Sequence, residues 1–186
     1  QAKRRAPPKG RGRLIKWAAA AVAAVALQIF VLVPLLADNM AKFIPIEGEK
    51  ALGEATFGHI REALDETGLT PIDVCTAEAG TAALNELVTK ISGDRAFRQD
   101  VTIAVLDHEM VNAFALPGGF VVLFRGLIEA ADGPDEVAAV VAHEIGHVIS
   151  RDPTRHALRS AGSIGVLGLL FGDFAGGAAV LFLTER

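Results

Sequence analysis

The sequence contains no tyrosine, one tryptophan and one cysteine. A single cysteine can form neither an internal disulfide nor a cysteine-based zinc site, so any metal site here must use histidine and carboxylate ligands. Acidic residues are absent before Asp38. From Asp38 onward the chain has 22 acidic and eleven basic residues, and such an acidic body is a poor partner for nucleic acid.

Charged residues are also scarce, because they make up only 22% of the 186 residues while 51% are hydrophobic. The mean hydropathy is +0.38. This composition excludes a disordered chain and is too apolar for an ordinary soluble domain, so we expect contact with lipid. The length allows one compact domain with a sizeable core.

Residues 17–37 carry no charge, and as a helix these 21 residues would span roughly 30 Å, the thickness of a bilayer core. Seven of the 18 basic residues lie in residues 1–16. A cleaved signal peptide and a buried core helix are the alternatives, but a signal peptide has a shorter apolar region. We therefore predict a basic cytoplasmic tail (1–16) and a single-pass anchor (17–37) in the inner (cytoplasmic) membrane, with a periplasmic domain after it.

The rest of the chain is predicted to hold a linker (38–48) and one domain (49–186). Amphipathic patterns predict helices over residues 49–67 and 77–91, and β-rich runs predict strands over 101–106, 111–116 and 120–124. The sequence Pro117-Gly118-Gly119 predicts a tight turn between the last two strands. These elements favour an α+β fold with a small, mostly antiparallel sheet beside helices. The chain starts at Gln1 and stops after an apolar run, so we expect a fragment cut at both ends.

A further helix is predicted from Asp135 to about Ser150, and it carries the pattern H-E-x-x-H at residues 143–147. His143 and His147 lie one turn apart, so both imidazoles can reach one Zn²⁺ ion. Glu144 points about 100° away around the helix and can act as a base toward water. The chemistry that this pattern favours is peptide-bond hydrolysis. The alternative is a pair of surface histidines beside a solvated glutamate, which the apolar flanks of the motif disfavour.

A catalytic zinc ion normally has three protein ligands, and the third is not evident in the sequence. The metzincin continuation is excluded, because Ser150 and Pro153 stand where glycine and histidine are needed. The remaining candidates, each weak on position, are His156, Asp173 and Glu185.

Several motifs together resemble the membrane-associated zinc metallopeptidases of the CAAX prenyl protease and HtpX type, which are gluzincins with a zincin-like fold. The matching segments are NAFALPGG (112–119), RGL (125–127), DEV (135–137) and AHEIGH (142–147). Residues 44–53 resemble the lead-in of the periplasmic BepA-like and the mitochondrial Oma-type members.

The resemblance implies that His143 and His147 bind zinc and that Glu144 is the catalytic acid and base. It also implies that Asn112, Ala113, Phe114 and Ala115 hold an extended polypeptide substrate by main-chain pairing. The third ligand of the family is a glutamate in a later helix; no such segment is present here, so we expect it beyond Arg186.

Residues 161–183 are apolar and rich in glycine. They suit either a second membrane segment or a helical hairpin, and Asp173 at their centre favours a hairpin packed on the domain or on the membrane surface. His59 and His108 are predicted to be surface or hydrogen-bonded histidines, and Cys75 a buried thiol.

The leading hypothesis is a membrane-anchored zinc endopeptidase, with envelope protein quality control as the role that the resemblance implies. The alternative is a noncatalytic, membrane-tethered binding or chaperone module that keeps the fold with an incomplete zinc site. A third hypothesis is a metal-free structural membrane protein. The sequence makes no prediction of the oligomeric state.

Overall fold

The computed structural model describes residues 11–65, 69–93 and 100–171. They form two compact units, one with residues 11–40 and 158–171 and the other with residues 41–157. The predicted α+β class is consistent with the structure, which is mostly helical and has one small sheet.

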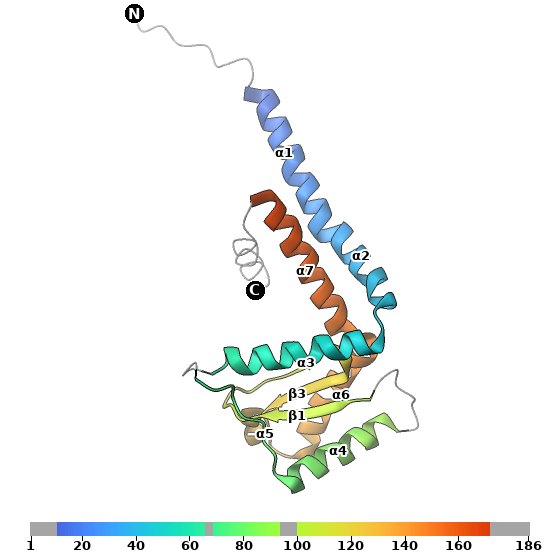
Figure 1. Cartoon of the computed structure of the whole chain (residues 1–186), viewed down its shortest axis with the longest axis vertical. Helices are drawn as coiled ribbons and strands as arrows, with labels where there is room; N and C mark the ends of the chain where they lie inside the picture. Colours follow the sequence, from blue (N-terminus) through green and yellow to red (C-terminus); the bar gives the residue numbers. More distant parts are fainter. Residues whose placement is uncertain (1–10, 66–68, 94–99, 172–186) are drawn as a thin grey trace, which may run out of the picture. The chain divides into compact units, whose positions relative to one another are not determined.

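The first unit contains one long helical run made of α1 (Arg11–Leu27), a π-helical stretch (Gln28–Leu32) and α2 (Val33–Met40), as Figure 1 shows. The π turn precedes Pro34, which has no N–H to donate to the carbonyl one turn back, and the Val33 N–H reaches Gln28 instead. Large apolar side chains are exposed along this run; Phe30, for example, is 73% exposed. By length and composition, residues 11–43 are the one candidate membrane span among the described residues.

The first unit also contains residues 158–171 of α7 (Asp152–Phe171), which pack against α2. A Cβ on Gly162 would lie 2.9 Å from Val33 Cγ1, so the two helices approach closely there. Arg159 Nη2 donates to Asp38 Oδ1 at 2.6 Å. The segment predicted as a hairpin over 161–183 is therefore helical as far as Phe171, while Asp173 and the rest of it lie outside the described residues.

The second unit is built on a three-stranded sheet with the order β1-β3-β2. Its strands are β1 (Thr102–Leu106), β2 (Ala113–Leu116) and β3 (Phe120–Phe124). β1 pairs with β3 in parallel and β2 pairs with β3 antiparallel, so the sheet is mixed. The prediction of a mostly antiparallel sheet was wrong. The 107–112 connection leaves room for a strand between β1 and β2, and β3 fills this place and runs parallel to β1.

Helices cover both faces of this sheet (Figure 1). On one face lies α3 (Ile46–Ala63), whose residues Phe57 and Ile60 pack on Val122 and Phe124. On the other lie α4 (Glu78–Ser92) and α6 (Pro134–Ser150), which pack on Val121 and Leu123 with α5 (Arg125–Ala130) at the end of β3. The helices predicted over 49–67, 77–91 and 135–150 are thus present; the first begins three residues earlier than predicted, at Ile46, and ends at Ala63.

The start of α3 is fixed to the turn between β2 and β3. A Cβ on Gly53 would lie 2.0 Å from the Pro117 carbonyl oxygen, so only glycine allows this contact. Gly118, at φ +80°, approaches Lys50 in the same way. This contact holds the first turn of α3, and with it Glu49, in place beside the sheet.

Candidate metal centre

The helix α6 carries the H-E-x-x-H motif, and its ends explain its position. Pro134 occupies the first turn, where a missing N–H costs nothing, and Asp135 and Glu136 follow where the helix dipole favours acids. Glu136 also accepts a hydrogen bond from the Asp132 N–H at 2.9 Å. The helix ends at Ser150, before Arg151 in the left-handed conformation.

One face of α6 is buried against the sheet through Val141, Ile145 and Val148. These residues recur at the spacing of helical turns, so they form a single apolar stripe. His143 lies outside this stripe and is exposed, and His147 is half-buried beside it. Burial of the stripe therefore fixes the direction in which both histidines project.

The two imidazoles converge. Nε2 of His143 lies 3.1 Å from Nε2 of His147, and the ring planes are perpendicular. Zinc binds imidazole nitrogens at about 2.0–2.1 Å, and tetrahedral geometry then separates two such nitrogens by roughly 3.3 Å. The observed separation fits two ligands on one ion.

A carboxylate orients the second histidine. Nδ1 of His147 lies 2.9 Å from Oδ2 of Asp152, so the ring donates a proton there and leaves the Nε2 lone pair for a metal. Arg155 Nη2 lies 2.5 Å from the other oxygen of Asp152. The pKa of Asp152 lies below its ordinary value, first because His147 donates to the carboxylate and second because Arg155 does. Sequence reasoning missed Asp152, although a carboxylate one turn beyond the second histidine was a usable signal.

Glu144 lies on α6 between the two histidines and is 8% exposed. A carboxylate so far removed from solvent is not a solvated surface residue, which disfavours the alternative of two surface histidines beside a solvated glutamate. Its neighbours on the helix project in two other directions, His143 toward the His147 ring and Ile145 toward the sheet.

No group of three or more metal-binding side chains occurs within residues 11–65, 69–93 and 100–171. His156 is exposed on α7 and belongs to no such group. Asp173 and Glu185 lie outside the described residues. The part of the chain that the structure describes therefore supplies two convergent imidazoles and no third ligand beside them.

The predicted substrate strand lies at an edge of the sheet. Ala113 and Ala115 of β2 pack toward α6, and Phe114 points to the opposite face, where its ring lies 5.7 Å from that of Phe124. Among the described residues no strand pairs with the outer edge of β2. This edge therefore runs next to the helix that carries the histidines.

Main-chain groups along this edge alternate in direction. The Phe124 N–H donates to the Asn112 carbonyl at 3.1 Å, so residues 112, 114 and 116 face β3. Residues 113 and 115 consequently direct their main-chain groups outward. The Ala113 N–H donates to Asn112 Oδ1 at 2.9 Å. Within the described ranges no strand pairs with the Ala113 carbonyl or with the two main-chain groups of Ala115, so these groups could bind an extended segment.

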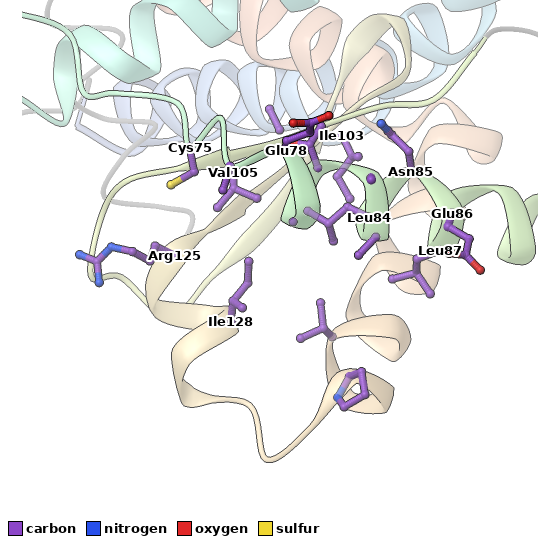
Figure 2. Close-up of a pocket in the computed structure, with 18 of the residues that line it drawn as sticks. Cys75, Glu78, Leu84, Asn85, Glu86, Leu87, Ile103, Val105, Arg125 and Ile128 are labelled. Atoms are coloured by element: carbon purple, nitrogen blue, oxygen red, sulfur yellow. The ribbon is translucent and has the colours of Figure 1, made fainter.

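A cleft of about 1290 Å³ lies elsewhere in the second unit, between α4, β1 and the start of α6. Figure 2 shows apolar side chains such as Leu84, Leu87 and Val105 along it, with Arg125 at one side. Neither the two histidines nor Glu144 line it. The cleft is thus distinct from the histidine pair.

The remaining residues singled out in the sequence have ordinary surroundings. His108 Nδ1 accepts a hydrogen bond from the Met110 N–H at 3.1 Å, and His59 is exposed. Cys75 is a free thiol on the wall of the cleft and is half-buried, so the prediction of a buried thiol was too strong.

Comparison of the sequence with known proteins assigns the chain to a family. The model of peptidase family M48 matches residues 78–181, which is more than half of the chain and includes the whole of α6. The chain belongs to peptidase family M48. The metallopeptidase class inferred from the motif is thereby confirmed at the level of this family, whose members are zinc metalloproteases.

Relatives of this M48 chain fall into two groups. The chain is 29% identical over 124 residues to the beta-barrel assembly-enhancing protease of Yersinia pestis, a match that covers 67% of this chain and 24% of that protein. It is 43% identical over 49 residues to the mitochondrial metalloendopeptidase OMA1 of Arabidopsis thaliana (26% and 10%). For OMA1 of Schizosaccharomyces pombe the identity is 50% over 40 residues (22% and 12%). The chain thus spans a quarter or less of the length of these relatives.

Proposed function

We propose that this M48 chain is a membrane-anchored, zinc-dependent endopeptidase. The observation that carries the proposal is the convergence of His143 and His147, with Asp152 behind the second ring, in a chain of a metallopeptidase family. Carboxylate-supported histidine is the usual form of a zinc ligand in enzymes.

The positions of the side chains support the following catalytic roles. His143 and His147 would hold the ion, and the third ligand would come from outside the described residues. A zinc ion bound there would supply Lewis-acid activation of the scissile carbonyl and would lower the pKa of a water molecule toward about 7. Glu144 would act as the base that accepts a proton from the attacking water and as the acid that returns it to the leaving amine. Its low exposure favours this role, because proton transfer from a dry site is not diverted to bulk solvent.

The outer edge of β2 would hold the substrate. An extended polypeptide can accept from the Ala115 N–H and donate to the Ala113 and Ala115 carbonyls, which adds a fourth strand to the sheet. This pairing recognises main chain and not side chains, so it suits substrates that expose unfolded segments. Because Asn112 Oδ1 already accepts a hydrogen bond from the Ala113 N–H, main-chain pairing with the substrate would end at this N–H.

The exposed apolar run from Arg11 to Met40 supports the anchor. Seven basic residues before Trp17 favour a cytoplasmic N-terminus and a periplasmic peptidase domain. The role in envelope protein quality control draws on the names of two relatives, a beta-barrel assembly-enhancing protease and a mitochondrial metalloendopeptidase. Labelling of single cysteines placed before Trp17 and after Phe43, in a Cys75→Ser background, with a membrane-impermeant reagent tests the topology, and only the second site should react from outside.

The test of the chemistry is Glu144→Gln in the full-length protein. Cleavage of an unfolded polypeptide should fall at least about 10²-fold, because general acid–base catalysis contributes about 10²–10⁴-fold, and zinc content should stay the same. Glu54→Gln is the matched control, since Glu54 is exposed on α3. Undiminished cleavage by the Glu144 variant would contradict the proposed mechanism.

The second candidate function is a noncatalytic, membrane-tethered binding module. The observation that favours it is that the described residues contain only two convergent histidines. It predicts that the full-length protein binds unfolded polypeptide at the β2 edge without cleaving it and carries no stoichiometric zinc. Measurement of bound zinc per polypeptide therefore separates the two candidates.

A further inference from the structure

We propose that Glu49, at the start of α3, is a positioning residue for the metal centre: through Arg151 it fixes the turn that holds Asp152 against His147. The inference rests on the proposed function, because it concerns how the zinc-binding histidine is oriented. Within the part of the chain that the structure describes, the Glu49 side chain is hydrogen-bonded to Arg151 and Thr154 and to neither histidine.

Glu49 is the buried end of a network that joins α3 to the α6–α7 turn. Its side chain is 0% exposed. Its Oε1 atom accepts from Arg151 Nε at 2.8 Å and Nη2 at 2.6 Å, and from Thr154 Oγ1 at 2.6 Å. Arg151 Nη2 also donates to the Ile44 carbonyl at 3.3 Å. Three donors thus hold one carboxylate oxygen, and two of them come from a residue in the turn.

The turn needs this support because of its backbone. Arg151 has φ 56° and ψ 29°, and it is the only residue other than glycine with a positive φ among the described residues. The left-handed region is unfavourable for a residue with a Cβ, and glycine is the usual choice at the end of a helix. An arginine there is expected where its side chain makes contacts that glycine cannot make. The contacts with Glu49 and Ile44 are of that kind.

The conformation of Arg151 determines where Asp152 lies. Asp152 follows Arg151 directly and begins α7, and its carboxylate receives Nδ1–H of His147. Residues 151–154 are therefore held from two sides, by Glu49 through Arg151 and Thr154 and by His147 through Asp152. If Arg151 left the left-handed region, the direction of the chain at Asp152 would change and the His147 ring would lose its partner.

Loss of the Glu49 charge should act on the metal site through this route. With glutamine at position 49, the half-buried Arg151 guanidinium loses its counter-ion. The ion pair then no longer offsets the cost of the left-handed conformation of Arg151. Partners that orient a metal-binding histidine contribute about 10- to 100-fold to metal affinity. We expect a loss of zinc affinity in that range for Glu49→Gln.

The experiment compares zinc affinity, measured by competition with a chelator, and the visible spectrum of the Co²⁺ form in variants of the full-length protein. Glu49→Gln should weaken zinc binding and alter the Co²⁺ spectrum. Glu49→Gln with Arg151→Gly should restore both to near the wild-type values, because glycine adopts the left-handed turn without a partner. Glu49→Gln with Arg151→Ala should not, because alanine does not. Val122→Ala, which removes methyl groups from the opposite face of the sheet, controls for general destabilisation.

Each outcome bears on the proposal. Equal affinities for the glycine and alanine double variants would overturn it, as would wild-type affinity in Glu49→Gln or an equal loss in Val122→Ala. If Glu49→Gln fails to fold, the comparison of the two double variants still decides. A wild-type protein that binds no zinc would overturn the proposed function and this inference together, whereas normal zinc binding in both the wild type and Glu49→Gln would overturn the inference alone.

Discussion

Replacement of Gly53 by alanine should destabilise the second unit, although alanine is the better helix former. Gly53 lies inside α3, where Gly→Ala normally stabilises a helix by about 0.5–1 kcal/mol. A Cβ at this position, however, would lie 2.0 Å from the Pro117 carbonyl oxygen and 2.8 Å from a ring carbon of Phe120. The nearer atom is main chain in a tight turn, so α3 itself must move away.

The magnitude follows from these two opposing effects. Overpacking of this kind costs about 1–3 kcal/mol, which exceeds the gain in helix propensity. We expect a net loss of about 1–2 kcal/mol, which corresponds to a fall of roughly 4 °C per kcal/mol in the apparent Tm. Gly58→Ala is the matched control, because it lies one and a half turns along the same helix and a Cβ there meets nothing within 4 Å. It should raise the apparent Tm.

Thermal unfolding of the two variants, followed by circular dichroism in the same detergent, measures the difference. Because Gly53 holds the turn of α3 that carries Glu49, Gly53→Ala should also weaken zinc binding, while Gly58→Ala should not. A shift of both variants in the same direction would show that α3 is not seated on the Pro117 turn as the structure has it.

Three further predictions concern other parts of the second unit. Asp152→Asn should weaken zinc binding by about 10- to 100-fold, measured by chelator competition, because His147 loses a charged acceptor; unchanged affinity would refute the orienting role. Ala115→Pro removes an outward N–H at an edge where proline is tolerated, so it should raise KM for an unfolded substrate with little change in kcat, and an unchanged KM would argue against strand addition at β2. The pKa of Glu86 lies below its ordinary value because Lys90 donates to it at 2.7 Å, so Lys90→Ala should raise the Glu86 pKa in an NMR titration. A lowered carboxyl pKa stabilises the fold at pH values above the ordinary pKa, and this contribution is lost as the pH falls through the folded pKa.

Features set by local sequence were predictable. The bounds of α6 follow from Pro134, the acids after it and the apolar stripe, all within one segment. The convergence of His143 and His147 follows from helix geometry alone. The contact of Asp152 with His147 was also predictable from local sequence, because the two residues are five positions apart.

Features set by distant residues were not predictable. The sheet order depends on where the 107–112 connection carries β2, and no residue in the strands themselves encodes that choice. Glu49 and Arg151 are 102 positions apart, so nothing in the pattern around either residue indicates the pair.

X-ray absorption at the zinc edge, on the purified full-length protein, measures whether the two imidazoles of α6 share one zinc ion. We expect one zinc per chain with two imidazole nitrogens at about 2.0–2.1 Å, and the loss of one imidazole contribution in His147→Ala. A protein without bound zinc, or with zinc whose spectrum does not change in that variant, would contradict it.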